Sequence, residues 1–247
     1  MSDAETPGDS SDGGDRLLEI DAPTDPLAGH PATAYFWGHV AGSGTVSDDG
    51  LEVVANDEAS AQVLAAVAGG EVDHDRTTHE YAHDPSITRT EDEYTVAVTA
   101  AAGDEDDLLG RTSRLGLPVD GRGNYRFEAF SSHERELLRG LLEGCGTVCF
   151  KSSSGTVGIS FVHEERALLE RVQTLLEACP VETPYGDLGT TSSGGFWFGV
   201  DDEAAPAFGG WLYEDCERTG LYAPSRRRKL ERSLEQAEIE DRTPLGP

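Results

Sequence analysis

The feature that most constrains this chain is a glycine-interrupted helix pattern that runs directly into a strand pattern. In residues 134–148 (ERELLRGLLEGCGTV), leucines at positions 137, 138, 141 and 142 give a helix one broad apolar stripe. The helical pattern ends at Gly144-Cys145-Gly146, and a β-prone run over 147–151 follows. Because Gly140 and Gly144 have no Cβ, a second backbone can approach this helix closely.

The same arrangement occurs earlier in the chain. Residues 34–46 (AYFWGHVAGSGTV) contain Gly38, then Gly42-Ser43-Gly44, then a short β-prone run, and Gly44 lies 102 positions before Gly146. Each copy is followed by a short strand pair and by a helix pattern with an acidic start, over 57–68 and 164–177. An internal repeat of this kind predicts two similar halves.

The two copies, residues 36–44 and 138–146, resemble the LAGLIDADG motif of homing endonucleases and their relatives, in a single chain that carries both motifs. The similarity runs from about residue 33 to about residue 235. It implies an α+β fold of two pseudo-symmetric αββαββα halves packed through their motif helices, for which a monomer is sufficient. The resemblance places six glycines at the interface between the motif helices: Gly38, Gly42, Gly44, Gly140, Gly144 and Gly146.

The resemblance also identifies the residues that decide catalysis. In this family the acid before the last glycine of each motif holds the divalent metal between the scissile phosphates, and here Ser43 and Cys145 occupy those positions. Hard cations such as Mg²⁺ require oxygen ligands, preferably carboxylates. Glu143 lies two positions before Cys145, so its side chain should project from another part of the helix end. The sequence therefore predicts no catalytic residues and a nuclease activity that has been lost.

The net charge says more about the salt content of the cell than about whether the protein binds nucleic acid. The formal net charge is −28, and Lys151 and Lys229 are the only lysines. This composition is typical of a cytoplasmic protein from a halophile with an acidic proteome. At about 1 M salt the screening length is about 3 Å, so repulsion between more distant surface carboxylates is largely screened. Such acidity would normally argue against nucleic acid, but in a halophile it argues little. The four cysteines are expected to be buried thiols, and no signal peptide or long apolar run is present.

The chain divides into an acidic tail expected to be disordered (1–28), a first half (29–116), a linker (117–130), a second half (131–240) and a short tail (241–247). The first half is expected to contain helix 33–43, a hairpin over 45–54 that turns at 48–50, helix 57–68, a hairpin of 72–81 with 93–99, and a short helix over 103–115. In the second half we expect strands at 147–151, 156–162, 181–185 and 195–200, and helices at 164–177, 204–213 and 225–238.

The candidate nucleic-acid contacts are basic or hydroxyl residues on predicted strands, on the linker and at the start of the last helix. Arginine and serine there could reach phosphates or base edges, although each is also an ordinary exposed polar residue. The basic run 225–229 opposes the dipole of its helix, so a compensating interaction is expected. The candidates are Arg76, Arg89, Arg122, Arg126, Lys151, Ser153, Arg226, Arg227, Arg228 and Lys229.

Two other groups of residues have alternative interpretations. His79-Glu80-Tyr81-Ala82-His83 matches the H-E-x-x-H zinc signature, which needs both histidines on one face of a helix. The β-prone residues before it and Asp84-Pro85 after it favour a strand instead, so we expect no metal there. The aromatics of 196–198, with Trp211 and Tyr213, could stack on bases but fit a hydrophobic core better.

The leading hypothesis is a catalytically inactive LAGLIDADG-type protein that binds nucleic acid, DNA before structured RNA, with a regulatory role as one use of that binding, and with no cofactor and no membrane contact. One alternative is a metal-dependent hydrolase, either a nuclease that uses Mg²⁺ with displaced acids such as Glu143 or a zinc enzyme that uses His79 and His83. The other is a protein-interaction module on the same scaffold.

Overall fold

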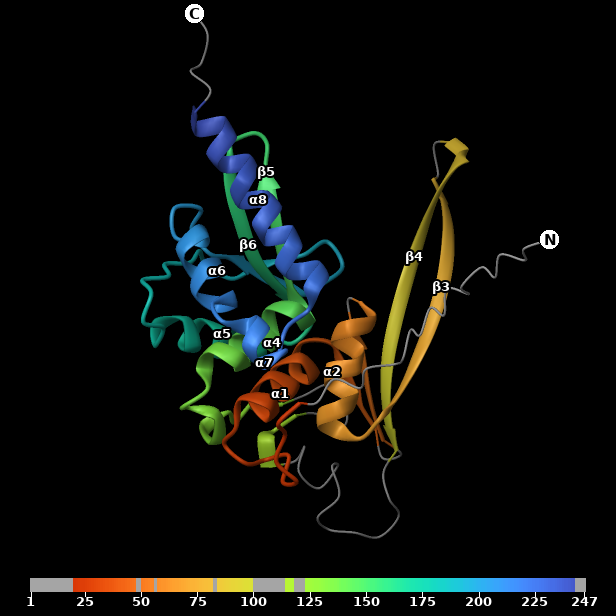
Figure 1. The fold of residues 1–247 in the computed structure, drawn as a ribbon. Helices are drawn as coiled ribbons and strands as arrows, with labels where there is room; N and C mark the ends of the chain where they lie inside the picture. The colour runs from red at the N-terminus through yellow and green to blue at the C-terminus, as the bar shows by residue number, and fades with distance from the viewer. Residues whose placement is uncertain are drawn as a thin grey trace, which may run out of the picture.

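The computed structural model describes residues 20–47, 50–55, 57–81, 84–99, 114–117 and 123–242, with side chains except over 77–91 and 241–242. Two αββαββ-like halves follow each other along the chain (Figure 1). The first half consists of α1 (Pro31–Ser43), β1 (Gly44–Val46), β2 (Gly50–Ala55), α2 (Glu58–Ala68), β3 (Glu71–Tyr81) and β4 (Asp84–Thr99). After η1 (Glu128–Phe130), the second half consists of α4 (Glu134–Cys145), β5 (Gly146–Lys151), β6 (Thr156–His163), α5 (Arg166–Glu177), β7 (Gly189–Thr190), β8 (Phe196–Gly199), α6 (Ala205–Tyr213), α7 (Cys216–Thr219) and α8 (Pro224–Arg242).

Each half forms one antiparallel sheet of four strands. The first sheet has the order β1-β2-β4-β3 and the second has the order β5-β6-β8-β7. In both sheets the strand that leaves the motif helix is an edge strand, and Gly44 and Gly146 begin these strands opposite Val53 and Phe161. The expected α+β fold with two pseudo-symmetric halves is confirmed.

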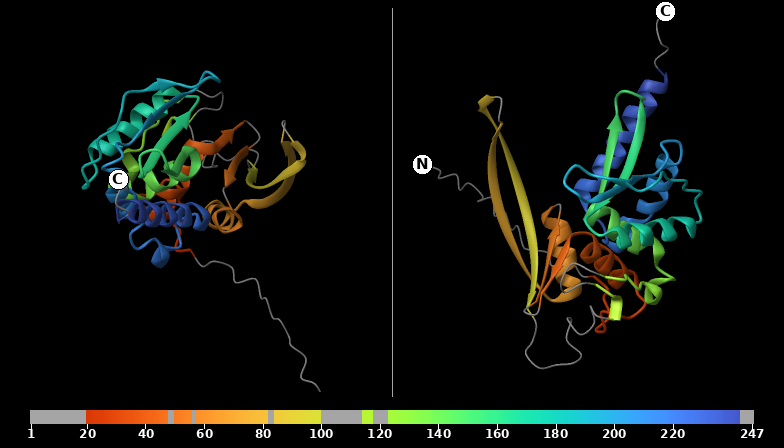
Figure 2. Two further views of the ribbon diagram at one scale, coloured as in Figure 1. Left: turned by 90° about the horizontal axis from the view of Figure 1, so that it is seen from above. Right: turned by 180° about the vertical axis from the view of Figure 1, so that it is seen from behind.

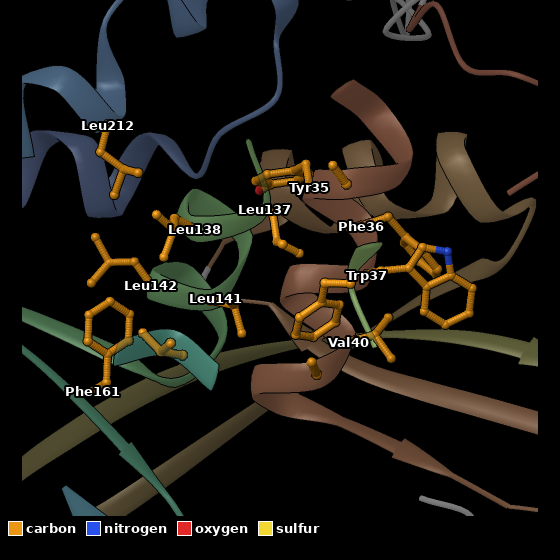
Figure 3. Packing of buried hydrophobic residues seen from close by; sticks show 14 of the residues in the cluster. Tyr35, Phe36, Trp37, Val40, Leu137, Leu138, Leu141, Leu142, Phe161 and Leu212 are labelled. Atoms are coloured by element: carbon orange, nitrogen blue, oxygen red, sulfur yellow. The ribbon is translucent and has the colours of Figure 1, made fainter. Parts of the chain in front are cut away.

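Helices α1 and α4 form the centre of the molecule. Tyr35, Phe36 and Trp37 of α1 are fully buried. Leu137 and Leu141 of α4 point toward α1, while Leu138 and Leu142 point toward Leu212 and Phe161 of the second half (Figure 3). Burying an aromatic or leucine side chain contributes roughly 1.5–3 kcal/mol each, so this contact stabilises both halves at once. Helix α1 is buried on all sides, and for that reason its sequence lacks the one-sided pattern of α4.

The helices cover one face of the second sheet and of the base of the first sheet, while the outer part of the β3–β4 hairpin extends beyond them (Figure 1). In β2 the burial alternates, with Leu51, Val53 and Ala55 buried and Glu52 and Val54 exposed, as expected of a strand with one covered face. Seen from behind, the two sheets stand on either side of the molecule with α1 between their bases (Figure 2). We call the face of each sheet that points away from the helices its open face.

The C-terminal elements are attached to the second half and to the start of α2. Arg139 of α4 is buried and donates from Nε to the Leu212 carbonyl at 2.7 Å and from a terminal nitrogen to the Leu221 carbonyl at 2.9 Å. Asp57, the N-cap of α2, accepts the Ser60 amide at 2.9 Å and the Ser225 amide at 2.8 Å. Asp57 therefore caps one helix and binds the first turn of α8, supplying negative charge near its basic run.

Several expected boundaries differ from the structure. The acidic tail was expected through residue 28, but Pro26 already accepts a hydrogen bond from the buried Trp37 indole at 2.6 Å. A strand was expected over 181–185, but only Tyr185 forms an isolated bridge, to Val200, because Pro180 and Pro184 cannot donate to a ladder. The expected turn residues Asp48 and Asp49, the tails 1–19 and 243–247, and most of the expected helix 103–115 lie outside the described residues.

Candidate nucleic-acid interface

The two motif helices meet through glycine at two levels. A Cβ on Gly38 would collide with the Leu137 carbonyl, and one on Gly140 would collide with the Tyr35 carbonyl. One turn later a Cβ on Gly42 would lie 3.0 Å from the Cα of Gly144. The helix tips are therefore in backbone contact, which only glycine permits.

Gly44 and Gly146 have a different role from the four glycines between the helices. Each follows the last residue of its motif helix, and its amide donates to the carbonyl of Val40 or Leu142. A Cβ on Gly44 would lie 2.6 Å from the Val40 carbonyl oxygen, and one on Gly146 would lie 2.6 Å from the Leu142 carbonyl oxygen. These two glycines close their own helices, and the atoms nearest to an added Cβ belong to the same helix.

Ser43 and Cys145 lie at the two tips, where the resemblance places metal-binding acids. The Ser43 hydroxyl donates to the Val54 carbonyl at 2.9 Å, and the Cys145 thiol donates to the Leu141 carbonyl at 3.3 Å. Burial raises the pKa of the Cys145 thiol to about 12, so it stays protonated at neutral pH. Neither side chain offers an anionic oxygen to a cation.

Glu143 is the acid nearest these tips along α4, and it is turned into the protein. It is buried, accepts the Tyr35 hydroxyl at 2.5 Å and accepts the Ala223 amide at 2.9 Å. Burial raises the pKa of Glu143 to about 7, although these two donors favour its charged form. Glu143 thus joins α1, α4 and the residue before α8, and it does not reach the open face.

His39 lies one turn before Ser43 and is also buried. Its Nε2 lies 3.1 Å from the Val54 carbonyl, the same oxygen that Ser43 contacts. Desolvation lowers the pKa of His39 to about 4, so the ring is neutral at physiological pH. Over the described ranges, no three His, Cys, Asp or Glu side chains gather closely enough to hold a metal ion.

The open face of the first sheet is acidic. The ladder pairs Thr45 with Glu52, Glu52 with Ala97 and Val54 with Thr95, which identifies the residues on this face. The register of β3 with β4 extends this face along both strands, although residues 71–76 of β3 are exposed on both faces. Five exposed acids share the face in its described part: Glu52, Glu71, Asp73, Asp75 and Glu93.

The open face of the second sheet carries small, neutral residues and one aromatic side chain. The ladder places Thr147 opposite Ser160, Cys149 opposite Gly158 and Lys151 opposite Thr156. Trp197 pairs with Val162 on this face, and these side chains are 45% and 42% exposed. Trp197 was expected in the core with its neighbours, but only Phe198 is fully buried, because alternate residues of a strand face opposite sides.

The predicted basic residues whose side chains the structure describes do not lie on one surface. Arg76 lies on the helix side of β3, in register with Asp92, and donates from Nε to Asp92 at 2.8 Å. Lys151 is on the open face of the second sheet and contacts Asp202 at 2.5 Å. Ser153 is exposed in the β5–β6 turn, and Arg126 is exposed on the linker. Arg122 and the Arg89 side chain lie outside the described part of the chain.

The basic run of α8 is largely engaged within the protein. Arg227 pairs with Glu217 and Glu231 and lies over the Tyr222 ring at 5.5 Å. Arg226 is half-buried near the α2 cap and lowers the pKa of Cys145 against the larger effect of burial. Arg228 and Lys229 are exposed on α8. The pairs of Arg227 with Glu217 and Glu231 offset the unfavourable interaction of this basic run with the dipole of α8, as expected from the sequence.

The H-E-x-x-H motif lies on a strand where it is described. His79 and Glu80 belong to β3, whose ladder sets them opposite Arg89 and Thr88. A strand cannot place residues i and i+4 on one helical face, so the zinc-protease arrangement is not formed there. His83 lies outside the described residues.

A cavity of about 620 Å³ lies between the first helix tip and the second sheet. Gly42, Gly44 and Thr45 line it on one side, and Val162 lines it on the other. Thr191 and Ser193 of the β7–β8 turn add hydroxyl groups to its wall. The cavity therefore extends from the tip of α1 to Val162, the residue paired with Trp197 in the second sheet.

Comparison with known proteins identifies the family. The LAGLIDADG family model described as "Putative archaeal homing endonuclease" matches residues 12–240. The protein belongs to this family of LAGLIDADG proteins. None of the curated proteins matches the chain.

Solved structures are similar to this chain at low sequence identity, and I-WcaI shows the same fold. The homing endonuclease I-WcaI bound to its DNA recognition sequence is 8% identical, with a TM-score of 0.51 over 82% of this chain and 87% of that one. Full-length DUF199/WhiA from Thermatoga maritima is 11% identical, with a TM-score of 0.47 over 90% of this chain and 66% of that one. I-DmoI in complex with DNA and Mn is 13% identical, with a TM-score of 0.45 over 74% of this chain and 97% of that one. The chain thus spans just under two thirds of the full-length WhiA protein.

Proposed function

We propose that this protein binds nucleic acid, DNA in the first instance, and does not cleave it. The observation that carries the proposal is the pair of helix tips. They are in backbone contact through Gly42 and Gly144, yet Ser43 and Cys145 bind only main-chain carbonyls there. The scaffold is retained and the acids that would hold a divalent metal are absent.

The loss of cleavage follows from ligand chemistry. Mg²⁺ takes oxygen ligands in octahedral geometry and is usually held by one or two carboxylates together with substrate phosphates. A neutral thiol and a hydroxyl that already donates to Val54 supply no carboxylate. Glu143 cannot act as a displaced acid in this geometry, because both of its oxygens accept internal hydrogen bonds.

The binding part of the proposal is supported by the family and by the form of the two open faces. The matching family is described as a homing endonuclease family, and I-WcaI, which has the same fold, is bound to its DNA recognition sequence. In this chain the open faces flank the helix tips and are free of covering helices (Figure 2). Because binding without cleavage acts only through occupancy, we include a regulatory role in the proposal.

Two assays test these parts separately. Retention on an immobilised genomic-DNA column at several KCl concentrations should fall as salt rises, because counterion release accompanies phosphate contacts. Absence of retention at every salt concentration would contradict DNA binding. Incubation of plasmid with purified protein and Mg²⁺ or Mn²⁺ should leave it supercoiled, and nicking that disappears in Glu143→Gln would contradict the inactive assignment.

A protein-interaction role is the second candidate, and one observation favours it. Five acids on the open face of the first sheet repel phosphate and suit a basic partner. If the DNA column retains nothing while the intact protein binds a basic polypeptide such as a protamine-derived peptide, this candidate replaces the first. Among the described residues, no helix is long and apolar enough to cross a bilayer.

A further inference from the structure

We propose that the open face of the second sheet binds an unpaired nucleobase, with the Trp197 indole as its stacking platform. This inference rests on the proposed nucleic-acid function and specifies that the ligand is single-stranded or unpaired nucleic acid. The nucleic acid that this half takes would be single-stranded or locally unpaired, because bases inside a duplex are already stacked on their neighbours.

The position of Trp197 is the first argument. Its neighbours in the ladder are Val162 on one side and Gly189 on the other. A Cβ on Gly189 would lie 2.6 Å from the indole Nε1 and 3.0 Å from Cε2, so the ring lies across the glycine backbone. One side of the indole is supported by β7, and the side chain remains 45% exposed. A supported, half-exposed indole is a rigid aromatic surface.

The surroundings of Trp197 are the second argument. Positions on the same face are small: Ser160 and Gly199 form the next ladder pair, and Gly158 follows on β6. Val162, the ladder neighbour of Trp197 on β6, lines the cavity beside the first helix tip. A planar group can therefore lie on the indole, while the hydroxyls of Thr191 and Ser193 border the adjoining space.

The charge of this face is the third argument. In the described strands β5–β8, Lys151 is the only Lys or Arg on the open face, and it is bonded to Asp202. Binding here cannot depend on many phosphate contacts, whereas base–aromatic stacking tolerates any sequence and does not require counterion release. Stacking is therefore the main source of affinity at this site, and the salt dependence of single-strand binding should be shallow.

The test compares a 12-nucleotide oligothymidylate with a 12-base-pair duplex, both titrated by fluorescence anisotropy against the full chain at two KCl concentrations. The single strand should quench tryptophan fluorescence in the wild type and not in Trp197→Leu, in which the buried Trp37 and the half-buried Trp211 of α6 remain. Trp197→Leu should weaken single-strand binding at least tenfold, and Trp197→Phe should retain most of it. Val54→Ala is the matched control, because Val54 is a 40% exposed apolar residue on the other open face; it should bind like the wild type.

Each contrary outcome has a distinct meaning. If the duplex binds and the single strand does not, or if Trp197→Leu binds the single strand like the wild type, this inference fails and the proposed function stands. If neither nucleic acid binds, both fail. If the wild type forms a dimer by light scattering that Trp197→Leu abolishes, the face is a self-association surface and the inference is also overturned. Unchanged thermal melting of the variants would establish that they remain folded.

Discussion

The two sheets have the same strand order, but their open faces differ in charge and polarity. The first carries Glu52, Glu71, Asp73, Asp75 and Glu93, while the second carries Trp197, Val162 and small neutral residues. A repeat therefore preserves the positions of elements more strictly than the residues on a free surface. Close packing restricts which residues can occupy buried positions, whereas residues on an exposed face can change without disturbing the core.

The helix side of the two halves differs as well. Residues 102 positions apart occupy matching places on the motif helices, so Trp37 corresponds to Arg139 and Ala41 to Glu143. In the first half these positions are apolar. In the second half they are charged, and they hold the chain before and after α7 through carbonyl and amide groups.

We call the contacts of Arg139 with the Leu212 and Leu221 carbonyls and of Glu143 with the Ala223 amide the second-half anchor. Breaking it should have the largest effect on stability. Arg139→Met leaves the Leu212 and Leu221 carbonyls without their donor and Glu143 without a nearby cation, and it should cost about 3–5 kcal/mol of unfolding free energy in urea titration. Arg135→Met is the control one turn earlier, where a partly exposed Arg135–Glu214 pair at 3.2 Å should be worth less than about 1 kcal/mol. Equal losses in the two variants would show that the anchor has no special weight.

Glu143 gives the next largest effect, which depends on pH. Its folded pKa, about 7, lies above the ordinary value of 4.5, so the folded state binds the proton more tightly than the unfolded chain. The associated stability is fully present below about pH 4.5 and is lost as the pH rises to about 7, a change on the order of 3 kcal/mol. The difference in unfolding free energy between wild type and Glu143→Gln, measured in urea from pH 4.5 to 8, should follow this slope. A difference that does not vary with pH would contradict it.

Neutralising the first open face should have a smaller effect, on binding. Replacing its five acids by amides removes repulsion of phosphate and should raise duplex affinity about tenfold in 50 mM KCl, with a smaller gain in 1 M KCl, where the screening length is about 3 Å. The charge-matched control neutralises five exposed acids on helices and loops: Glu58, Glu128, Glu182, Glu235 and Glu240. If both variants gain equally, net charge matters and the face does not.

The smallest effect is expected at Lys151. Lys151→Gln removes the one Lys or Arg of the described open face of the second sheet, but that lysine already neutralises Asp202 at 2.5 Å. We expect duplex affinity to fall by about twofold or less, since each lost phosphate contact lowers the salt slope by about one at most. A loss above tenfold in electrophoretic mobility-shift titration would assign this face a larger electrostatic role.

Much of the fold could be predicted from local patterns. The glycine spacing of the two motifs predicted a close helix pair, and Gly38, Gly42, Gly140 and Gly144 do lie between α1 and α4. What the pattern could not separate was the role of Gly44 and Gly146. Both follow the last residue of a helix, and whether a glycine there contacts its own helix or its neighbour depends on the packing of the pair.

The surfaces were harder to predict. Which side of β3 carries Arg76 depends on its register with β4, a long-range property that one strand does not encode. Trp197 had a usable signal, because alternation opposite the buried Phe198 already predicts the other face. The anchor was also visible as an Arg139–Glu143 pair at i,i+4 on an otherwise apolar helix, although its partners, the carbonyls and amide around α7, were not.

Hydrogen–deuterium exchange of the full chain with and without bound 12-nucleotide oligothymidylate tests the central difference between the two faces most directly. The account predicts that binding protects backbone amides of β5, β6 and β8 around Trp197 and leaves β3 and β4 unchanged. Equal protection of both sheets, or protection confined to β3 and β4, would contradict it.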